Sequence, residues 1–524
     1  NRTTCFGGSR AADAPDFLIS AARLPLTGGL MDSEGQIRST DPTRTRVVIV
    51  GAGFGGLGLA IKLKASGADD FVILEKSDSV GGVWSNNRYP GAACDIPSHL
   101  YSFSFEPRAD WPQKFASQSE ILKYLRHCVQ KYGVAPHILF RTEVSEARWS
   151  EETAHWMVRT GDGRLFETQA LVTATGQLSR PVVPQLPGLK DFSGAAFHSA
   201  DWPDGCDLSG KNVAVVGTGA SAIQIVPSIA PIAGKLYVFQ RSAAYVLPKP
   251  DGFYSRFELS LFKKFPAMLK LSRLRMYLQH EARALAFVTW RAALRVKRGA
   301  FFRHLNRGVG DTKLRQRLIP DYSIGCKRIL LSNDFFPAMA RSNVELVTHS
   351  IREIRPHGIA DETGTERSVD VIIFATGFSA TDFLVPIKIT GVAGQDLHQS
   401  WKAGAEAYLG IVVAGFPNLF MLYGPNTNLA HNSIIYMLEG QIGYVMACLK
   451  RLQRGEIRTL DVKKTAQGSF NAAIQRRLNK SVWAKGCSSW YLTATRKNTT
   501  NWPGYSLGFR LQTRAPRWDD YAVR

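Results

Sequence analysis

The chain has 524 residues, more than one hydrophobic core usually serves, so we expect two or three domains. Its 45% hydrophobic and 21% charged residues are typical of a soluble globular protein. The sequence contains no run of about 18 apolar residues, the length that would be needed to cross a membrane. The 65 Lys and Arg outnumber the 43 Asp and Glu and give a net charge of +22, which could attract nucleic acid, anionic lipid or a polyanionic cofactor.

The amino-terminal residues and the cysteines bear on processing and compartment. Residues 1–30 lack an apolar stretch of signal-peptide length, and we expect residues 1–43 to be an extension that is disordered or foreign to the natural protein. The seven cysteines form no Cys-x-x-Cys pair and no metal-ligand cluster with His. We therefore expect a reducing, cytoplasmic location, no structural zinc or other metal, and no partner for Cys487.

The first folded segment is a strand that runs into a glycine-rich turn. The strand Val47-Val-Ile-Val leads into Gly51-x-Gly53-x-x-Gly56, helical apolar spacing follows, and a second strand ends on Glu75. This order is typical of a dinucleotide-binding fold. Glu75 would accept hydrogen bonds from ribose hydroxyls and repel a 2′-phosphate, so the site should hold FAD or NAD and not NADP.

The next segment, residues 81–101, is rich in Gly, Pro and Asn and has no clear hydrophobic period. A loop that is ordered by function more than by propensity often lines a site. On its composition alone, Asp95 in this loop could equally be a turn residue that caps its own loop.

A second glycine turn and two downstream Ala-Thr-Gly sequences indicate two related folds. The turn is Gly217-x-Gly219, and the sequence Ala-Thr-Gly occurs at 174–176 and again at 375–377, each time after a buried strand. Small residues there allow backbones to approach closely. We pair the first turn with the first Ala-Thr-Gly and the second with the second. The sequence thus predicts an α/β protein with two Rossmann-like dinucleotide-binding domains and a chain that crosses between them.

The segment before the second turn carries the most specific motif in the chain. It reads Phe192-x-Gly194-x-x-x-His198-x-x-x-Trp202-Pro203 and resembles the fingerprint of type I Baeyer-Villiger monooxygenases, which are class B flavoprotein monooxygenases. The resemblance runs from about residue 46 to residue 510. It implies that His198 is a hinge residue at the domain junction, with Trp202 packed there, and not a proton shuttle.

The same resemblance assigns roles within residues 81–101. Their Gly-Gly-x-Trp and Arg-Tyr-Pro-Gly-x-x-x-Asp elements are similar to the family's flavin-contacting segment. The resemblance implies that Trp84 and Asp95 lie near the isoalloxazine ring, with Gly82 and Tyr101 also at the flavin. It further implies that Asp95 holds the catalytic arginine.

The second turn is expected to bind NADPH. The strand that follows it ends on Arg241 instead of an acid, and a planar cation can pair with a phosphate at two points. If Arg241 were only a solvated strand end, the preference between NADPH and NADH would stay open. Thr218, Ser221 and Gln224 follow the turn at positions from which their side chains could reach the pyrophosphate.

Residues 251–317 show helical spacing and carry 16 Lys and Arg against 4 Asp and Glu. The family has a helical subdomain inserted here. The charge has two interpretations: a solvated face that also steers NADPH, which we favour, or a patch that attracts a membrane surface. Nucleic acid is disfavoured, since no nucleic-acid-binding motif accompanies the charge.

The segment that contains Lys327 and Arg328 resembles the family's catalytic loop. By that resemblance, Arg328 is the essential arginine and Lys327 is a second contact to the 2′-phosphate. In the implied mechanism, reduced flavin and dioxygen give an anionic C4a-peroxyflavin. A guanidinium that cannot deprotonate would stabilise this anion and the charge on its adduct with a ketone.

The carboxy-terminal part is expected to return to the flavin fold. A Gly-Pro turn at 424–425 precedes a helix predicted over residues 434–452, and in the family this region closes over the flavin. We interpret His431 as a packing or hydrogen-bonding residue. Residues 483–491 resemble the family's mobile loop, whose aromatic residue, here Trp490, folds over the nicotinamide.

Together these features predict a domain layout. We expect a discontinuous FAD-binding domain, an NADP-binding domain and a helical insert. They are assigned to residues 44–178 with 377–510, to 179–247 with 327–376, and to 248–326, respectively.

The predicted activity is the NADPH-consuming insertion of one oxygen atom of O2 beside the carbonyl of a small lipophilic ketone, which gives an ester or lactone. The alternative is a flavin-containing monooxygenase that oxidises N or S atoms and needs no arginine over the flavin. A non-catalytic flavin-binding or membrane-docked protein is disfavoured by the intact motifs, and at most peripheral membrane contact is expected. A disulfide reductase is excluded because the first fold carries no paired redox cysteines. Neither the ketone nor the oligomeric state can be read from the sequence.

Overall fold

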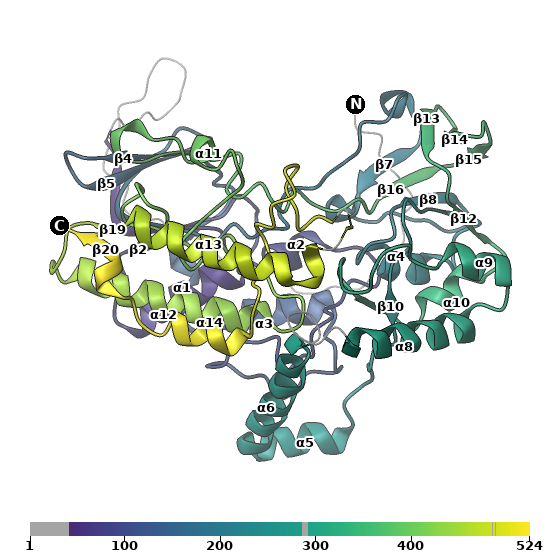
Figure 1. Ribbon diagram of the computed structural model, residues 1–524, viewed down its shortest axis with the longest axis horizontal. Helices are drawn as coiled ribbons and strands as arrows, with labels where there is room; N and C mark the ends of the chain where they lie inside the picture. Colours follow the sequence, from purple (N-terminus) through teal and green to yellow (C-terminus); the bar gives the residue numbers. More distant parts are fainter. Residues whose placement is uncertain (1–40, 286–291, 485, 488) are drawn as a thin grey trace.

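The computed structural model describes residues 41–285, 292–484, 486–487 and 489–524. The predicted amino-terminal extension therefore lies outside the described residues, except for residues 41–43. The described chain forms a mixed α/β protein whose two main sheets lie in separate lobes (Figure 1). This is the predicted fold class.

The first lobe is organised around an eight-stranded sheet in the order β17-β4-β5-β6-β1-β2-β3, with β18 also paired to β6. Its strands are β1 (Thr43–Val50), β2 (Phe71–Leu74), β3 (Ile138–Leu139), β4 (Val144–Ser150), β5 (His155–Thr160), β6 (Leu165–Thr173), β17 (Lys388–Thr390) and β18 (Leu419–Met421). The central strand β1 is parallel to β2 and β6. Val47 and Ile49 pack with α1 (Phe54–Ala65) and α12 (Ile434–Gln453), whereas Val48 and Val50 pack on the opposite face. Burial on both faces explains the unbroken apolar run in this strand.

The second lobe contains a parallel five-stranded sheet in the order β12-β9-β8-β16-β7. Its strands are β7 (Ala195–His198), β8 (Asn212–Val216), β9 (Lys235–Phe239), β12 (Val344–Val347) and β16 (Val371–Phe374). Helices α4 (Ala222–Ile229) and α10 (Phe335–Met339) share one core with this sheet. The antiparallel strands β13 (Ile351–Arg355), β14 (Gly358–Asp361) and β15 (Glu366–Ser368) cover the other side.

The predicted pairing of each glycine turn with one Ala-Thr-Gly is confirmed. Strand β1 lies beside β6, and β8 lies beside β16. A Cβ atom on Gly51 would come within 2.7 Å of the Ala174 carbonyl oxygen, and one on Gly217 within 2.5 Å of the Ala375 oxygen. Both glycines also have positive φ, +104° and +115°, which side chains disfavour. The same close crossing of strand and turn is therefore built twice.

The predicted helical insert is present and has two parts. Helices α5 (Arg256–Lys264) and α6 (Pro266–Ala282) form a hairpin that projects below the two lobes in Figure 1. Helices α8 (Ala292–Gly308) and α9 (Thr312–Arg317) instead lie against the second lobe, where Phe301 is fully buried. The paired strands β10 (Val246–Leu247) and β11 (Leu330–Leu331) connect the insert to the lobe.

The carboxy-terminal part contacts both lobes. Strands β17 and β18 join the first sheet, whereas Leu478, Trp483 and Phe509 share a hydrophobic core with the second sheet. Helix α12 begins at Ile434 as expected and ends one residue beyond the prediction, at Gln453. The remaining elements are the helices α2 (Val83–Asn86), α3 (Gln118–Lys131), α11 (Leu397–Ser400), α13 (Lys464–Lys480) and α14 (Ser506–Gln512), the strands β19 (Leu460–Val462) and β20 (Tyr521–Val523), and the short 3-10 helices at 135–137, 189–191, 199–201, 392–394, 482–484 and 518–520. The described chain stays folded beyond residue 510, since β20 pairs with β19.

Candidate active site between the two lobes

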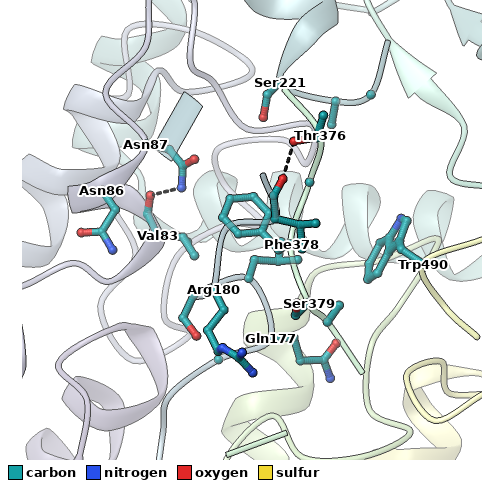
Figure 2. A pocket seen from close by; sticks show the side chains of 18 of the residues that line it. Val83, Asn86, Asn87, Gln177, Arg180, Ser221, Thr376, Phe378, Ser379 and Trp490 are labelled. Atoms are coloured by element: carbon teal, nitrogen blue, oxygen red, sulfur yellow. Dashed lines mark hydrogen bonds between the residues drawn. The ribbon is translucent and has the colours of Figure 1, made fainter. Parts of the chain in front are cut away.

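A cavity of about 1060 Å³ lies between the two glycine turns and is lined from both lobes. Figure 2 shows side chains from each lobe around it. Asn86 and Asn87 come from the first lobe, Ser221 and Thr376 from the second, and Trp490 from the carboxy-terminal segment. The cavity is therefore a junction site and not a pocket within one fold.

The first glycine turn forms a bare backbone cradle on one side of this cavity. A Cβ atom on Gly56 would lie 1.9 Å from the Gly51 oxygen, so no side chain fits there. Gly82 packs against Gly53, where a Cβ on Gly82 would lie 3.3 Å from the Gly53 Cα. The turn leads into the amino terminus of α1, which favours a phosphate group. These residues fit a dinucleotide pyrophosphate.

Glu75 directly follows strand β2 at the cavity wall. Its carboxylate accepts hydrogen bonds from the backbone N–H groups of Ala52, at 2.7 Å, and Ser77, at 2.8 Å. These bonds fix the acid at the strand end, where a ribose would lie in a Rossmann-like site.

The loop of residues 81–101 supplies an aromatic wall. Trp84 Nε1 donates a hydrogen bond to the Tyr101 hydroxyl over 3.1 Å, and the Tyr101 ring meets the edge of Phe54 at 5.3 Å. Burial raises the pKa of Tyr101 well above its ordinary value, so its hydroxyl stays neutral. Trp84 and Tyr101 both line the cavity.

An ion pair between Arg328 and Asp95 joins the lobes at the cavity. Arg328 Nε lies 3.0 Å from Asp95 Oδ2, and Arg328 Nη2 donates to the same oxygen. The Asp95 carboxylate raises the pKa of Arg328 against the opposing effect of burial, so the guanidinium stays cationic. Both side chains line the cavity, and Arg328 keeps 28% of its side-chain surface exposed. A fixed cation thus faces the space between the two turns.

A second group of cations lies at the end of strand β9. Arg241 and Lys327 line a pocket with Ser242 and Tyr322. Lys327 Nζ donates to the Ser242 hydroxyl over 2.9 Å and lies 4.5 Å from the centre of the Tyr322 ring. Burial lowers the pKa of Lys327 and the neighbouring Arg241 lowers it further, although Asp321 partly offsets this. Two cations that repel each other in one pocket fit an anionic group such as a phosphate.

The second glycine turn also lines the cavity. A Cβ atom on Gly219 would meet no atom within 4 Å, and the Ser221 side chain lies at the cavity in Figure 2. The Thr218 hydroxyl donates to the Ser242 carbonyl over 2.9 Å. The Gln224 amide accepts from the Tyr89 hydroxyl at 3.0 Å and donates to the Ala93 carbonyl at 2.9 Å. Gln224 thereby joins the lobes, a contact between distant segments that sequence spacing does not reveal.

The fingerprint residues lie at the second sheet's edge, and none of the four lines the cavity. They are Phe192, Gly194, His198 and Trp202. His198 ends β7, is 2% exposed, and its Nδ1 accepts from the Ala200 N–H at 3.1 Å. Burial lowers its pKa. Gly194 leaves room for a carbonyl oxygen, since its Cβ would lie 2.2 Å from Asp370 O, and Trp202 packs on Phe197 at 5.2 Å.

The expectation that Cys487 has no partner is wrong. Cys487 forms a disulfide with Cys326 across a sequence separation of 161 residues. The bond ties the segment that carries Trp490 to the loop that carries Arg328. Without a Cys-x-x-Cys spacing, nothing in the sequence indicated this pairing, and the location predicted from unpaired cysteines loses that support.

The sequence missed one buried polar cluster beside the cavity, centred on Glu281 of α6. Burial raises the pKa of Glu281, but the adjacent His431 and hydrogen bonds from the Leu507 N–H, Ser506 and Asn432 outweigh it and lower the pKa to about 2. The Ser506 hydroxyl donates at 2.6 Å and Asn432 at 3.0 Å. His431 is buried in this cluster, with its Nε2 3.7 Å from Glu281 Oε2. The cluster fixes the end of α6 next to Asn432, which lines the cavity.

Within the described ranges, no three His, Cys, Asp or Glu side chains gather as a metal site. No helix in the same part of the chain is both long and apolar enough to cross a bilayer.

Known proteins with this geometry are flavin-dependent oxygenases. The flavin-binding monooxygenase-like family model matches residues 44–388. A Baeyer-Villiger monooxygenase of Pseudomonas aeruginosa is 45% identical over 483 residues, which cover 91% of this chain and 92% of the relative. An oxidised steroid monooxygenase bound to NADP superposes with a TM-score of 0.82 at 31% identity, over 92% of this chain and 99% of that one. A cyclohexanone monooxygenase from Rhodococcus sp. Phi1 bound to NADP+ superposes with a TM-score of 0.85 at 28% identity, over 92% and 100%.

Proposed function

Because this chain belongs to the flavin-binding monooxygenase-like family, and within it to the Baeyer-Villiger monooxygenases, we propose that it uses FAD, NADPH and O2 to convert a ketone into an ester or lactone. The observation that carries this proposal is the Arg328–Asp95 ion pair in the cavity between the two glycine turns. The names of the similar proteins support the cofactors, since two of the solved structures are bound to NADP or NADP+.

The first lobe would hold FAD. Its bare glycine turn would receive the pyrophosphate, Glu75 the ribose, and the wall that includes Trp84 and Tyr101 the ring system. When bound, reduced FAD would supply the activation of dioxygen. The residues of this chain bind and orient that group and keep one cationic guanidinium beside it.

Arg328 would stabilise negative charge on oxygen as the ketone carbonyl is attacked. A guanidinium cannot give up its proton at ordinary pH, so it would act by field and hydrogen bonding alone. Asp95 would orient it and hold it in place before the reaction. Oxidation of an N or S atom needs no such fixed cation, and the ion pair therefore favours a ketone substrate over that alternative.

The second lobe would hold NADPH, with Arg241 and Lys327 on the 2′-phosphate. Gly217 and Gly219 would receive the pyrophosphate, and Trp490 would lie over the nicotinamide. The substrate would be a small lipophilic ketone.

Rapid-mixing spectroscopy of the yellow holoprotein tests this function. The protein is reduced with NADPH and mixed with oxygenated buffer, with and without phenylacetone. We expect a long-lived absorbance transient that decays faster with the ketone and yields the ester. Arg328→Ala should retain bound flavin but form ester about 10²–10³-fold more slowly, the usual effect of removing one charge-stabilising donor.

A matched control variant sharpens the result. Arg180, another cavity-lining arginine, forms an ion pair with Asp382 at 3.4 Å, so Arg180→Ala removes a cation but leaves the Arg328 pair intact. It should keep ester formation. A transient that ignores ketones but is discharged by amines or sulfides would replace the proposal with N or S oxidation, and production of hydrogen peroxide alone would refute an oxygenase.

A further inference from the structure

The α5–α6 hairpin exposes an unusual number of large apolar side chains. Of the 18 exposed large hydrophobic residues in the described chain, eight lie between residues 253 and 285. Phe253 and Phe257 are 73% and 76% exposed, and Phe265 is 49% exposed. Monomeric proteins rarely expose apolar groups in such a concentration without a partner. The hairpin also projects away from both lobes (Figure 1).

Helix α6 is apolar on two opposite sides. Leu269 is buried against the body, and Arg273, on the same side, donates to the His99 carbonyl at 2.7 Å. Leu271, Leu274 and Leu278 follow at spacings of three and four, which places them in one stripe on the other side, and each is more than half exposed. The contacts of α6 with the body are therefore made by one side only, and the exposed stripe is a separate surface.

The exposed charges around this surface all have one sign. Between residues 253 and 285 they are Arg256, Lys263, Lys264, Lys270, Arg275 and Arg283. The two acids of this range both accept hydrogen bonds from other residues of the protein. Glu258 bonds Ser255 in the capping box of α5, and Glu281 lies in the buried cluster with Ser506.

We propose that the α5–α6 hairpin docks the protein peripherally on an anionic phospholipid bilayer. Exposed Phe and Leu side chains would enter the boundary between headgroups and acyl chains, while the cations would meet the headgroup phosphates. A second copy of the chain is a poor occupant, because a symmetric contact would set this cationic surface against itself. The hairpin lies on the membrane in this arrangement and does not cross it.

The hairpin also connects to the cavity. Glu281, in the last turn of α6, bonds Asn432, which lines the cavity. Docking would therefore bring the active-site side of the insert close to a phase in which lipophilic ketones concentrate. The docking itself uses no cofactor or substrate contact, so it can be tested independently of the proposed reaction.

Vesicle flotation of the full-length holoprotein tests the proposal. The vesicles contain phosphatidylcholine alone or phosphatidylcholine with phosphatidylglycerol. We expect binding to the anionic vesicles that weakens with salt. The double variants Lys263→Glu/Lys264→Glu and Phe257→Ser/Leu271→Ser should each lower the partition coefficient about ten-fold or more, because each surface cation and each buried apolar side chain contributes to such binding.

The control variants change the same kinds of exposed side chain, apolar and cationic, outside the hairpin. Ile232→Ser removes an exposed apolar side chain of the second lobe, and Lys190→Glu/Lys402→Glu reverses two exposed cations outside the insert. Both should bind anionic vesicles as the wild type does, and flavin content should be unchanged in all variants. The proposal is overturned if the wild type ignores anionic vesicles or if the hairpin variants bind as well as the controls. It is also overturned if light scattering shows a lipid-free oligomer that the hairpin variants dissociate, which would identify a second copy as the occupant.

Discussion

The first glycine turn leads to strand β2, which Glu75 follows directly, whereas the second leads to strand β9, which Arg241 follows after one residue. Up to those residues the two sites are built alike. Each has a parallel strand, a glycine with positive φ, a helix, and a second strand that carries Ala-Thr-Gly across the turn. In the proposed function, the backbone of each turn would supply a general pyrophosphate site, while one side chain after the strand would select what is attached to the ribose.

Matched glycine substitutions should separate the two sites with the largest effect. Gly51→Ala should lower the flavin content of the purified protein about ten-fold or more, because forcing left-handed backbone costs roughly 1–2 kcal/mol even before the clash with Ala174 is counted. Gly217→Ala, which would clash with Ala375, should keep flavin and lose NADP+ binding. Flavin absorbance and titration calorimetry measure the two outcomes.

Gly468→Ala is the control, since a Cβ atom there would meet nothing within 4 Å in helix α13. It should change neither cofactor. If Gly51→Ala and Gly217→Ala each removed both cofactors equally, the two sites would not be independent.

Removing Arg241 should reduce the expected preference of the second site for NADPH over NADH. Arg241→Ala should raise the KM for NADPH but not for NADH, by about ten- to 150-fold, since a hydrogen bond to a charged group contributes roughly 1.5–3 kcal/mol. Steady-state kinetics with both coenzymes measure the ratio. Arg241→Lys should retain part of the preference because it keeps the charge and loses the two-point geometry. An equal rise in KM for both coenzymes would mean that Arg241 does not bind the 2′-phosphate.

The pH dependence of NADP+ binding should follow Lys327. Its pKa is lowered by burial and by Arg241 in the free protein, and a bound phosphate would raise it. Protons should therefore be taken up on binding as pH approaches the alkaline range, and affinity should fall as pH rises through the lowered pKa. Calorimetry in buffers of different ionisation enthalpy measures this uptake. Lys327→Met should abolish it, whereas uptake that persists in this variant would belong to another group.

Much of this comparison could be predicted from sequence, because it depends on local order along the chain. The two turns, their strands, the Ala-Thr-Gly partners and α12 follow from apolar periodicity and glycine position. The pairing of Asp95 with Arg328, which are 233 residues apart, was expected only through the family resemblance. Its role in catalysis, like the anionic C4a-peroxyflavin, stays a prediction.

The contacts that the sequence did not reveal join distant segments without a motif. Gln224 was expected at a pyrophosphate, but its amide is bonded to Tyr89 and Ala93 of the other lobe. Glu281 belongs to no recognisable sequence motif in its basic helix, yet it anchors α6 to α14 through Ser506. Such contacts depend on how the lobes pack, which a spacing rule along one chain does not encode.

The Cys326–Cys487 disulfide gives the smallest predicted effect and adds a further asymmetry to the comparison. It ties Trp490's segment to the loop of Arg328, on the side proposed to bind NADPH, whereas Cys94, Cys128 and Cys448 of the first lobe are buried and unbonded to each other. Cys487→Ser should therefore free the segment and weaken NADP+ binding about two- to ten-fold, the effect of ordering one more side chain on binding. Flavin content should not change.

Dithiothreitol should act on the wild type as the substitution does, and it should have no further effect on Cys487→Ser. Cys206→Ser, at a half-buried cysteine of the second lobe that is outside the disulfide, controls for the loss of a sulfur atom and should bind NADP+ normally. Mass spectrometry after alkylation reports whether the 326–487 bond is present in each sample. If the bond is present and its reduction leaves NADP+ affinity unchanged, the disulfide does not contribute to NADP+ binding. The difference between the two sites is then confined to the residues that follow their strands.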